Sequence, residues 1–143
     1  NALRLARWRG LATRAEPLLA VLHLGYATVP LGFALLGWAL LDPAAIEPTA
    51  ALHVWLVGTF GSMTLAVMTR ASRGHSGRRL IADRIDVALY ALVFLGAAAR
   101  VAAPFAEGGI QLALDVAGGL WILAFLGFAA RYAPILLGPP AEA

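Results

Sequence analysis

Cysteine and lysine are both absent from this sequence, and charged residues of any kind are scarce. Without cysteine, the chain can form neither a disulfide nor a metal site with thiolate ligands. Charged residues make up 13% of the chain, whereas a soluble domain carries roughly 25%. Hydrophobic residues make up 61%, and the mean hydropathy is +0.79. This excess is larger than a buried core requires, so we expect much of the protein surface to face lipid.

The start of the chain has no initiator methionine and no recognisable signal peptide with a cleavage site. We therefore expect a segment of a longer polytopic protein, with the lipid bilayer and the remaining spans of the parent chain as partners. All eleven basic residues are arginines, and the pI near 10.2 could indicate nucleic-acid binding. The arginines lie at the ends of apolar stretches rather than along one soluble face, so we expect no nucleic-acid partner.

Four apolar stretches reach the length of about 20 residues that a membrane-crossing helix needs. They cover about residues 17–41, 49–69, 84–104 and 110–130. Short connections indicate antiparallel neighbours, so the predicted fold is an all-α, polytopic transmembrane, up-down four-helix membrane bundle over residues 17–137. An interfacial lead-in (1–16) precedes the bundle and a tail (138–143) follows it. Pro134 indicates that no helix extends far beyond Arg131.

Arginine is distributed unevenly between the two sides of this bundle. The lead-in, residues 70–84 and Arg131 hold ten of the eleven arginines. The other two connections hold no arginine and contain the acidic residues Asp42, Glu47 and Glu107. The positive-inside rule then places the arginine side, and both ends of this segment, in the cytoplasm.

Small residues recur every four positions on the second span, at Gly58, Ser62 and Ala66. In lipid, helices associate through close packing at such residues, so this ridge predicts a close neighbouring helix.

Charged residues inside the spans are costly and need partners. Arg100 and Asp115 lie at equal distances from the middle of the third connection, so antiparallel helices place them at one depth, and we predict an ion pair. Asp86 lies two residues after Arg84 at the cytoplasmic edge, and we expect it only to pair with the basic residues there.

Three histidines are the main candidates for chemistry. His23 lies about 9 Å from the cytoplasmic boundary and His53 about 25 Å above it. A difference of about 16 Å in depth prevents both from binding one iron, because a metal–imidazole bond is about 2 Å long. His75 lies on the same side as His23, so that pair is geometrically easier. Each histidine fits three roles, which are a haem or metal ligand, a proton relay, or a packing residue.

A loop that begins at Arg70 is expected to carry His75, with four arginines and no acidic residue up to position 79. One interpretation of this loop is contact with anionic lipid. The other is an anion cradle, in which Gly74 and Gly77 turn backbone N–H groups towards a carboxylate or phosphate and arginines such as Arg70 and Arg73 bind it. Haem propionates fit the second interpretation.

Three runs of sequence carry a family resemblance, and they are LHLGY at 22–26, ALHVWLVGTFGSMTLAVMTRASRGHSGR at 51–78 and LWILAFLGFAARYAPIL at 120–136. They resemble the C-terminal part of NnrS proteins. The resemblance implies a multi-pass protein of the bacterial inner membrane that contains haem and copper. It also implies a role in nitric oxide metabolism and resistance to nitrosative stress, with nitric oxide as an expected partner.

The resemblance also implies metal ligands, because His23, His53 and His75 stand at the family's histidine positions. The chain departs from the family pattern at Ser76, where we would expect threonine, and at the bulky pair Val54-Trp55.

Two other functions stay open from the residues alone. Ionisable side chains within the spans suit a proton-coupled membrane transporter, which broken helices at matching depths would favour. Only Pro30 interrupts a span. The other alternative is a structural membrane subunit that holds a partner. Catalytic residues are unknown, because the sequence contains neither a Ser/His/Asp order nor an HExxH motif.

Overall fold

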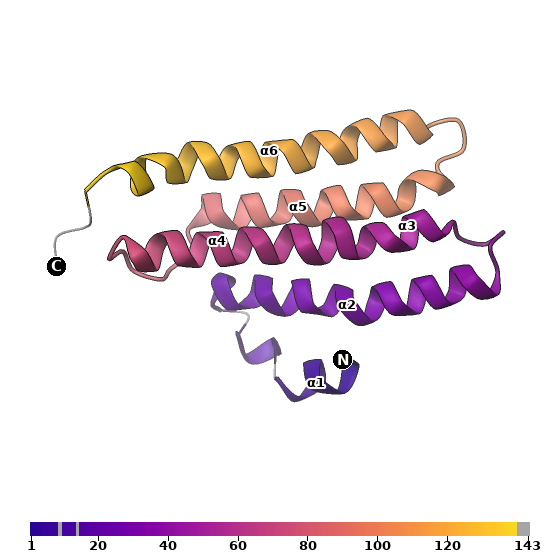
Figure 1. Ribbon diagram of the computed structural model, residues 1–143, viewed down its shortest axis with the longest axis horizontal. Helices are drawn as coiled ribbons and strands as arrows, with labels where there is room; N and C mark the ends of the chain where they lie inside the picture. The colour runs from indigo at the N-terminus through magenta and orange to yellow at the C-terminus, as the bar shows by residue number, and fades with distance from the viewer. Residues whose placement is uncertain (9, 14, 140–143) are drawn as a thin grey trace.

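The computed structural model describes residues 1–8, 10–13 and 15–139, so Arg9 and Arg14 of the predicted lead-in and residues 140–143 of the predicted tail lie outside it. Within the described residues the secondary structure is all-helical. Four long helical segments lie side by side and alternate in direction (Figure 1). Each is long and apolar enough to cross a membrane. The predicted up-down four-helix membrane bundle is therefore confirmed.

The first span is helix α2 (Pro17–Leu41). The second span is continuous and is built from α3 (Pro48–His53), the π-helix η2 (Val54–Gly61) and α4 (Ser62–His75). The third is α5 (Arg84–Ala102) followed by a short 3-10 turn, η3 (Ala103–Phe105). The fourth is α6 (Ile110–Leu137), and the lead-in contains α1 (Ala2–Arg7) and η1 (Gly10–Thr13).

Helix α4 continues to His75, which corrects the prediction that the second span breaks at Arg70. Arg73 lies in the last turn of α4, where the partial negative charge at the helix C-terminus favours a basic side chain, so it supports the helix instead of ending it. The end comes at Gly77, which has a φ of 71° that few other residues adopt. Beyond it, the Arg78 N–H donates to the carbonyl of Arg73 at 2.9 Å.

Helix α6 also runs further than predicted. It passes through Pro134 and ends at Leu137, instead of stopping near Arg131. A proline in the last turns removes only one hydrogen bond there, and the N–H of Gly138 donates to the Pro134 carbonyl at 3.1 Å to close the helix.

The ridge of small residues on the second span packs as predicted. Gly58, Ser62 and Ala66 are all buried, and they lie against α2. A methyl group at Gly25 of α2 would meet the Ser62 hydroxyl at 2.7 Å, so the two helices approach closely there. The hydroxyl groups of Thr28 and Thr59 hydrogen-bond across the same contact at 2.6 Å.

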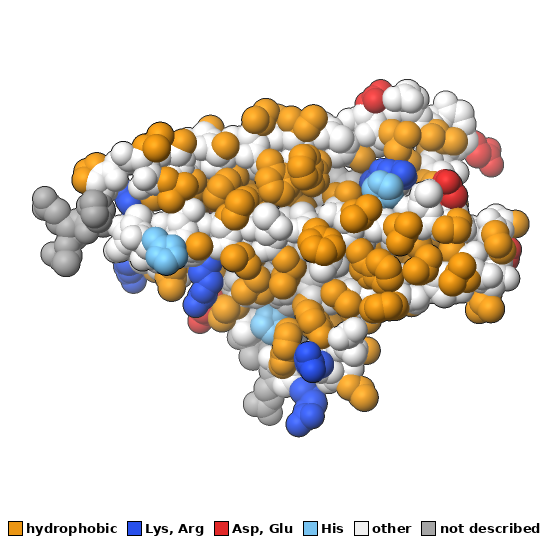
Figure 2. Space-filling view, viewed as in Figure 1, with side chains coloured by type: hydrophobic (Ala, Val, Ile, Leu, Met, Phe, Trp, Pro, Cys, Tyr) orange, Lys and Arg blue, Asp and Glu red, His pale blue; other side chains and the backbone are white. Residues whose placement is uncertain are grey.

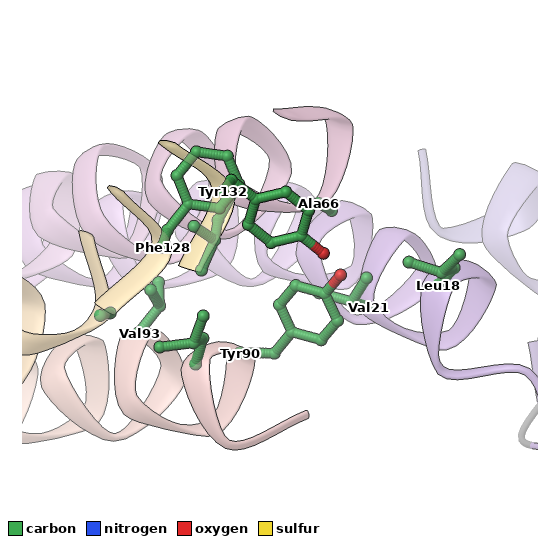
Figure 3. Packing of buried hydrophobic residues seen from close by; sticks show 10 residues of the cluster. Leu18, Val21, Ala66, Tyr90, Val93, Phe128 and Tyr132 are labelled. Atoms are coloured by element: carbon green, nitrogen blue, oxygen red, sulfur yellow. The ribbon is translucent and has the colours of Figure 1, made fainter. Parts of the chain in front are cut away.

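The main core occupies the half of the bundle that contains the start of α5 and the end of α6. The aromatic rings of Phe128, Tyr132 and Tyr90 converge there (Figure 3). They pack with smaller side chains of α2 and α4, including Leu18 and Leu65. Outside this core, large apolar side chains such as those of the α6 outer face are exposed, as expected for contact with lipid.

Candidate functional site

The three histidines lie in three different places. His23 is on α2, His53 ends α3 and His75 ends α4. Figure 2 shows three separate histidine patches on the face in view. In the part of the chain that the structure describes, no three His, Asp or Glu side chains lie close enough together to hold a metal ion. The fold therefore keeps the three predicted ligands apart, as the depth argument required for His23 and His53.

His53 has a defined ring orientation. Its Nδ1 lies 2.6 Å from the backbone carbonyl oxygen of Thr49, one turn earlier in α3. A carbonyl can only accept a hydrogen bond, so Nδ1 carries the proton. In the neutral tautomer with this proton, the lone pair is on Nε2, which is the form that ligates a metal.

His23 repeats this arrangement on α2. Its Nδ1 donates to the carbonyl oxygen of Leu19 at 2.9 Å. The lead-in folds back over this side of the helix, where the Trp8 ring lies edge-on, 5.9 Å from the His23 ring. Trp8 also packs on Tyr26, and the Tyr26 hydroxyl donates to Asn1. The predicted lead-in is thus packed on α2, next to a candidate ligand.

His75 differs from the other two, because it is exposed at the end of α4. It lines a shallow pocket of about 330 Å³ together with Arg70, Gly74 and Leu80. Gly74 lies inside the helix, so its N–H is not turned outward as the cradle interpretation required. Arg70 does lie beside His75, and its role as an anion ligand stays a prediction.

His53 lines a cavity of about 380 Å³ between the second span, α5 and α6. Arg100 of α5 lines the same cavity, and the other walls are apolar or glycine. The π-helix η2 begins at the residue after His53. π-helical turns widen a helix and are frequent at functional sites. No pattern in the sequence predicted the π-helix η2.

The predicted ion pair between Arg100 and Asp115 is wrong. Asp115 is exposed and accepts a hydrogen bond from Gln111 of its own helix at 2.8 Å. Among the described residues, no salt bridge involves Arg100. Equal depth does not fix the rotation of a helix about its axis, so the two side chains leave their helices in different directions.

A cluster of charges at the other end of the bundle was underestimated from the sequence. Asp86 is completely buried. Its carboxylate accepts from Arg73 Nη2 at 2.5 Å, from the Tyr132 hydroxyl at 2.8 Å and from Arg131 Nε at 3.3 Å. Asp83 also pairs with both arginines. We call these five residues the arginine–aspartate cluster, and it joins α4, α5 and α6.

The cluster also starts α5. Asp83 is the N-cap and accepts from the N–H groups of Ile85 and Asp86, while the Asp86 carboxylate accepts from the N–H of Asp83. Burial acts to raise the pKa of Asp83, but the N–H of Asp86, the charge of Arg131 and the N–H of Ile85 outweigh it and hold this pKa below its ordinary value of 3.8.

Arg73 is therefore occupied by protein groups. Its Nε donates to the Tyr132 hydroxyl at 3.0 Å, and its Nη2 donates to Asp86. Of the two arginines predicted to bind an anionic cofactor, only Arg70 has no such carboxylate partner among the described residues. The sequence did contain a signal for this cluster, since Arg131-Tyr132 and Asp83–Asp86 both lie at the arginine-rich edge of the bundle.

Comparison with known proteins gives one family. The family model described as NnrS protein matches residues 1–139, so the chain belongs to the NnrS family. Searches of curated proteins and of solved structures gave no match. Family membership and the four spans identify a membrane protein related to the response to nitric oxide.

Proposed function

We propose that this member of the NnrS family binds haem and copper in the bacterial inner membrane and acts in nitric oxide metabolism and resistance to nitrosative stress. The observation that carries the proposal is the ring state of His53 and His23. Each donates its Nδ1–H to the carbonyl four residues earlier, at 2.6 Å and 2.9 Å, which leaves Nε2 as a metal ligand. The proposed partners are the bilayer, the remaining spans of the parent chain and nitric oxide.

The donor set of this chain fits such metals. Imidazole nitrogen suits both iron and copper, so His23, His53 and His75 are each proposed as ligands for either. Bound haem iron or copper would supply the centre to which nitric oxide binds. This chain would hold that centre on fixed helices and keep water away from the apolar cavity at His53. Because the three histidines lie apart, we expect other ligands to come from the remaining spans.

The proposal is tested on the full-length parent protein purified in detergent. Absorption spectra in the oxidised and reduced states measure haem, and elemental analysis measures copper, for the wild type and for H23A, H53A and H75A. We expect bound haem and copper in the wild type and a loss of one or the other in each variant. Leu52→Ala, at an exposed position beside His53, is the matched control and should keep both. A wild type without either metal, or three variants that retain both, would contradict the proposal.

A proton-coupled transporter is the second candidate function, and one observation favours it. Pro30 lies inside α2, and the Trp55 indole of the adjoining π-helix donates to the Val29 carbonyl at 3.1 Å. A helix that contains proline and a π-helix thus meet within the bundle, and transport sites are built where helices depart from regular geometry. Both helices are continuous here. Proteoliposomes with an internal pH dye test this directly. Proton uptake that depends on the parent protein would support transport, and its absence would remove this candidate.

A further inference from the structure

The cavity at His53 contains two polar side chains of different chemistry. His53 offers an imidazole, and Arg100 offers a guanidinium. The remaining walls include the Trp121 ring together with Val57 and Leu114. In Figure 2, a histidine and a basic side chain appear together among hydrophobic ones where α3 and α5 meet. With His53 as a metal ligand, as the proposed function has it, a ligand that fits both polar groups carries a metal, an anionic group and a large apolar surface.

Arg100 lies in the last turn of α5, far from the arginine–aspartate cluster. It is only partly exposed, within a span and 16 residues after Arg84, which corresponds to about 24 Å along α5. Every salt bridge found among the described residues belongs to the arginine–aspartate cluster, at the other end of that helix. The partial negative charge at the C-terminus of α5 favours a guanidinium at this position. Because no carboxylate among the described residues pairs with it, its N–H donors are available to an anion that enters the cavity.

The same cavity has room for a ligand at one wall. A methyl group added at Gly118 of α6 would meet no atom within 4 Å, so this wall opens onto free space. Gly96 of α5 differs, because a methyl group there would meet the carbonyl oxygen of Ala117 at 3.1 Å. The helices are therefore in close contact at Gly96, whereas Gly118 is an exposed residue of the cavity wall that takes no part in this contact. Trp121 lies beside this opening and provides a flat aromatic surface.

We propose that Arg100 binds a propionate carboxylate of the haem whose iron His53 ligates, in the cavity between the second span, α5 and α6. This assignment rests on the proposed function. The sequence predicted Arg73 as a propionate ligand, but Arg73 already binds Asp86 and Tyr132. Arg100 takes this role in the present proposal, because it shares a cavity with His53. Guanidinium groups suit carboxylates because two N–H donors can face the two oxygens.

The first experiment measures haem affinity by titrating haem into the parent protein prepared from haem-limited cells. Arg100→Gln should weaken binding about tenfold or more, the range expected for loss of a charge-assisted hydrogen bond. Arg100→Lys should recover part of the affinity. Arg84→Gln, at an exposed arginine at the opposite end of α5, is the control and should bind as the wild type does.

Haem dimethyl ester separates a direct contact from a structural effect, because its propionates carry no charge. The wild type should bind the ester more weakly than haem, and R100Q should bind the ester as the wild type does. Equal losses for haem and ester in R100Q would show that Arg100 acts on the fold, and no loss for either would show that it does not touch the ligand. Both results would overturn the inference.

A second pair of variants tests the cavity. Gly118→Leu fills the open wall and should reduce haem binding, whereas Gly119→Leu, where added atoms also meet nothing within 4 Å but which does not line the cavity, should not. Haem binding that survives G118L unchanged would place the haem elsewhere. A failure of this inference can be distinguished from a failure of the proposed function. Loss of haem in H53A with normal binding in R100Q overturns this inference alone, and a wild type that binds no haem overturns the proposed function as well.

Discussion

Asp86 lies fully buried at the start of α5, and its two carboxylate oxygens accept hydrogen bonds from side chains of α4 and α6. Replacing it by asparagine leaves Arg73, whose side chain is only 12% exposed, without its closest counter-charge. Breaking a buried pair in this way costs about 3–5 kcal/mol, so Asp86→Asn should lower the unfolding midpoint of the detergent-purified protein clearly. Asp115→Asn is the control, because Asp115 is exposed and bonded only to Gln111. Equal midpoints for the two variants would contradict this role.

The pKa of Asp83 predicts how the same cluster responds to acid. This pKa lies below its ordinary value of 3.8, so the folded state favours the charged carboxylate. The stabilisation is complete above that ordinary value and is lost as the pH falls through the lower, folded-state pKa. Asp83→Asn keeps an N-cap side chain but removes the charge. We expect it to be less stable than the wild type at pH 7, with the difference disappearing in acid. A difference in unfolding midpoint that is independent of pH would contradict the prediction.

Single residues also show where sequence reasoning stops. The ring states of His23 and His53 follow from the carbonyl one turn earlier, and the residues themselves were identified from the sequence. The ion pair predicted for Arg100 was wrong, because a sequence indicates the depth of a side chain but not the direction in which it leaves the helix. Arg73 was assigned to a ligand for the same reason, although folding brings Asp86 and Tyr132 to it from two other helices.

At the scale of helices, the contact between α2 and the second span depends on glycine. A methyl group at Gly25 would come within 2.7 Å of the Ser62 hydroxyl, whereas one at Gly37 of the same helix would meet nothing within 4 Å. Gly25→Ala should therefore separate the helices and destabilise the bundle by about 1–3 kcal/mol, as overpacking does. Gly37→Ala should be neutral or slightly stabilising. Thermal unfolding of both variants in detergent checks this, and a harmless G25A would show that the contact can relax.

Most of the helix pattern could be predicted because apolar length is a strong signal in membranes. The errors concern the helix ends and one internal irregularity. The sequence suggested a break at Arg70 and a stop near Arg131, but α4 reaches His75 and α6 reaches Leu137. A helix can continue through charged residues and through a proline in its last turns, and hydropathy alone does not predict this. The π-helix Val54–Gly61 has no signature of its own, because its residues are as apolar as those of a regular span.

At the scale of the whole molecule, the three candidate ligands face different parts of the bundle. His53 lines a cavity between three spans, His23 lies under the lead-in and His75 is exposed at a helix end. Much of the outer surface is apolar, as for helices that meet lipid or further helices. The fold therefore keeps the three histidines at separate places, and the proposed function requires further ligands for each metal.

The proposed orientation follows from the two ends of the bundle and can be tested because this segment contains no cysteine. Arg79 and Glu107 are both exposed, in the connections at opposite ends. Ten of the eleven arginines lie at the Arg79 end or in the lead-in, so we expect that end in the cytoplasm. In intact spheroplasts, a membrane-impermeant maleimide should label Glu107→Cys in the parent protein and should label Arg79→Cys only after lysis. The unsubstituted parent gives the background from cysteines elsewhere. Labelling of R79C alone before lysis would reverse the proposed orientation and place the arginine–aspartate cluster on the outer side.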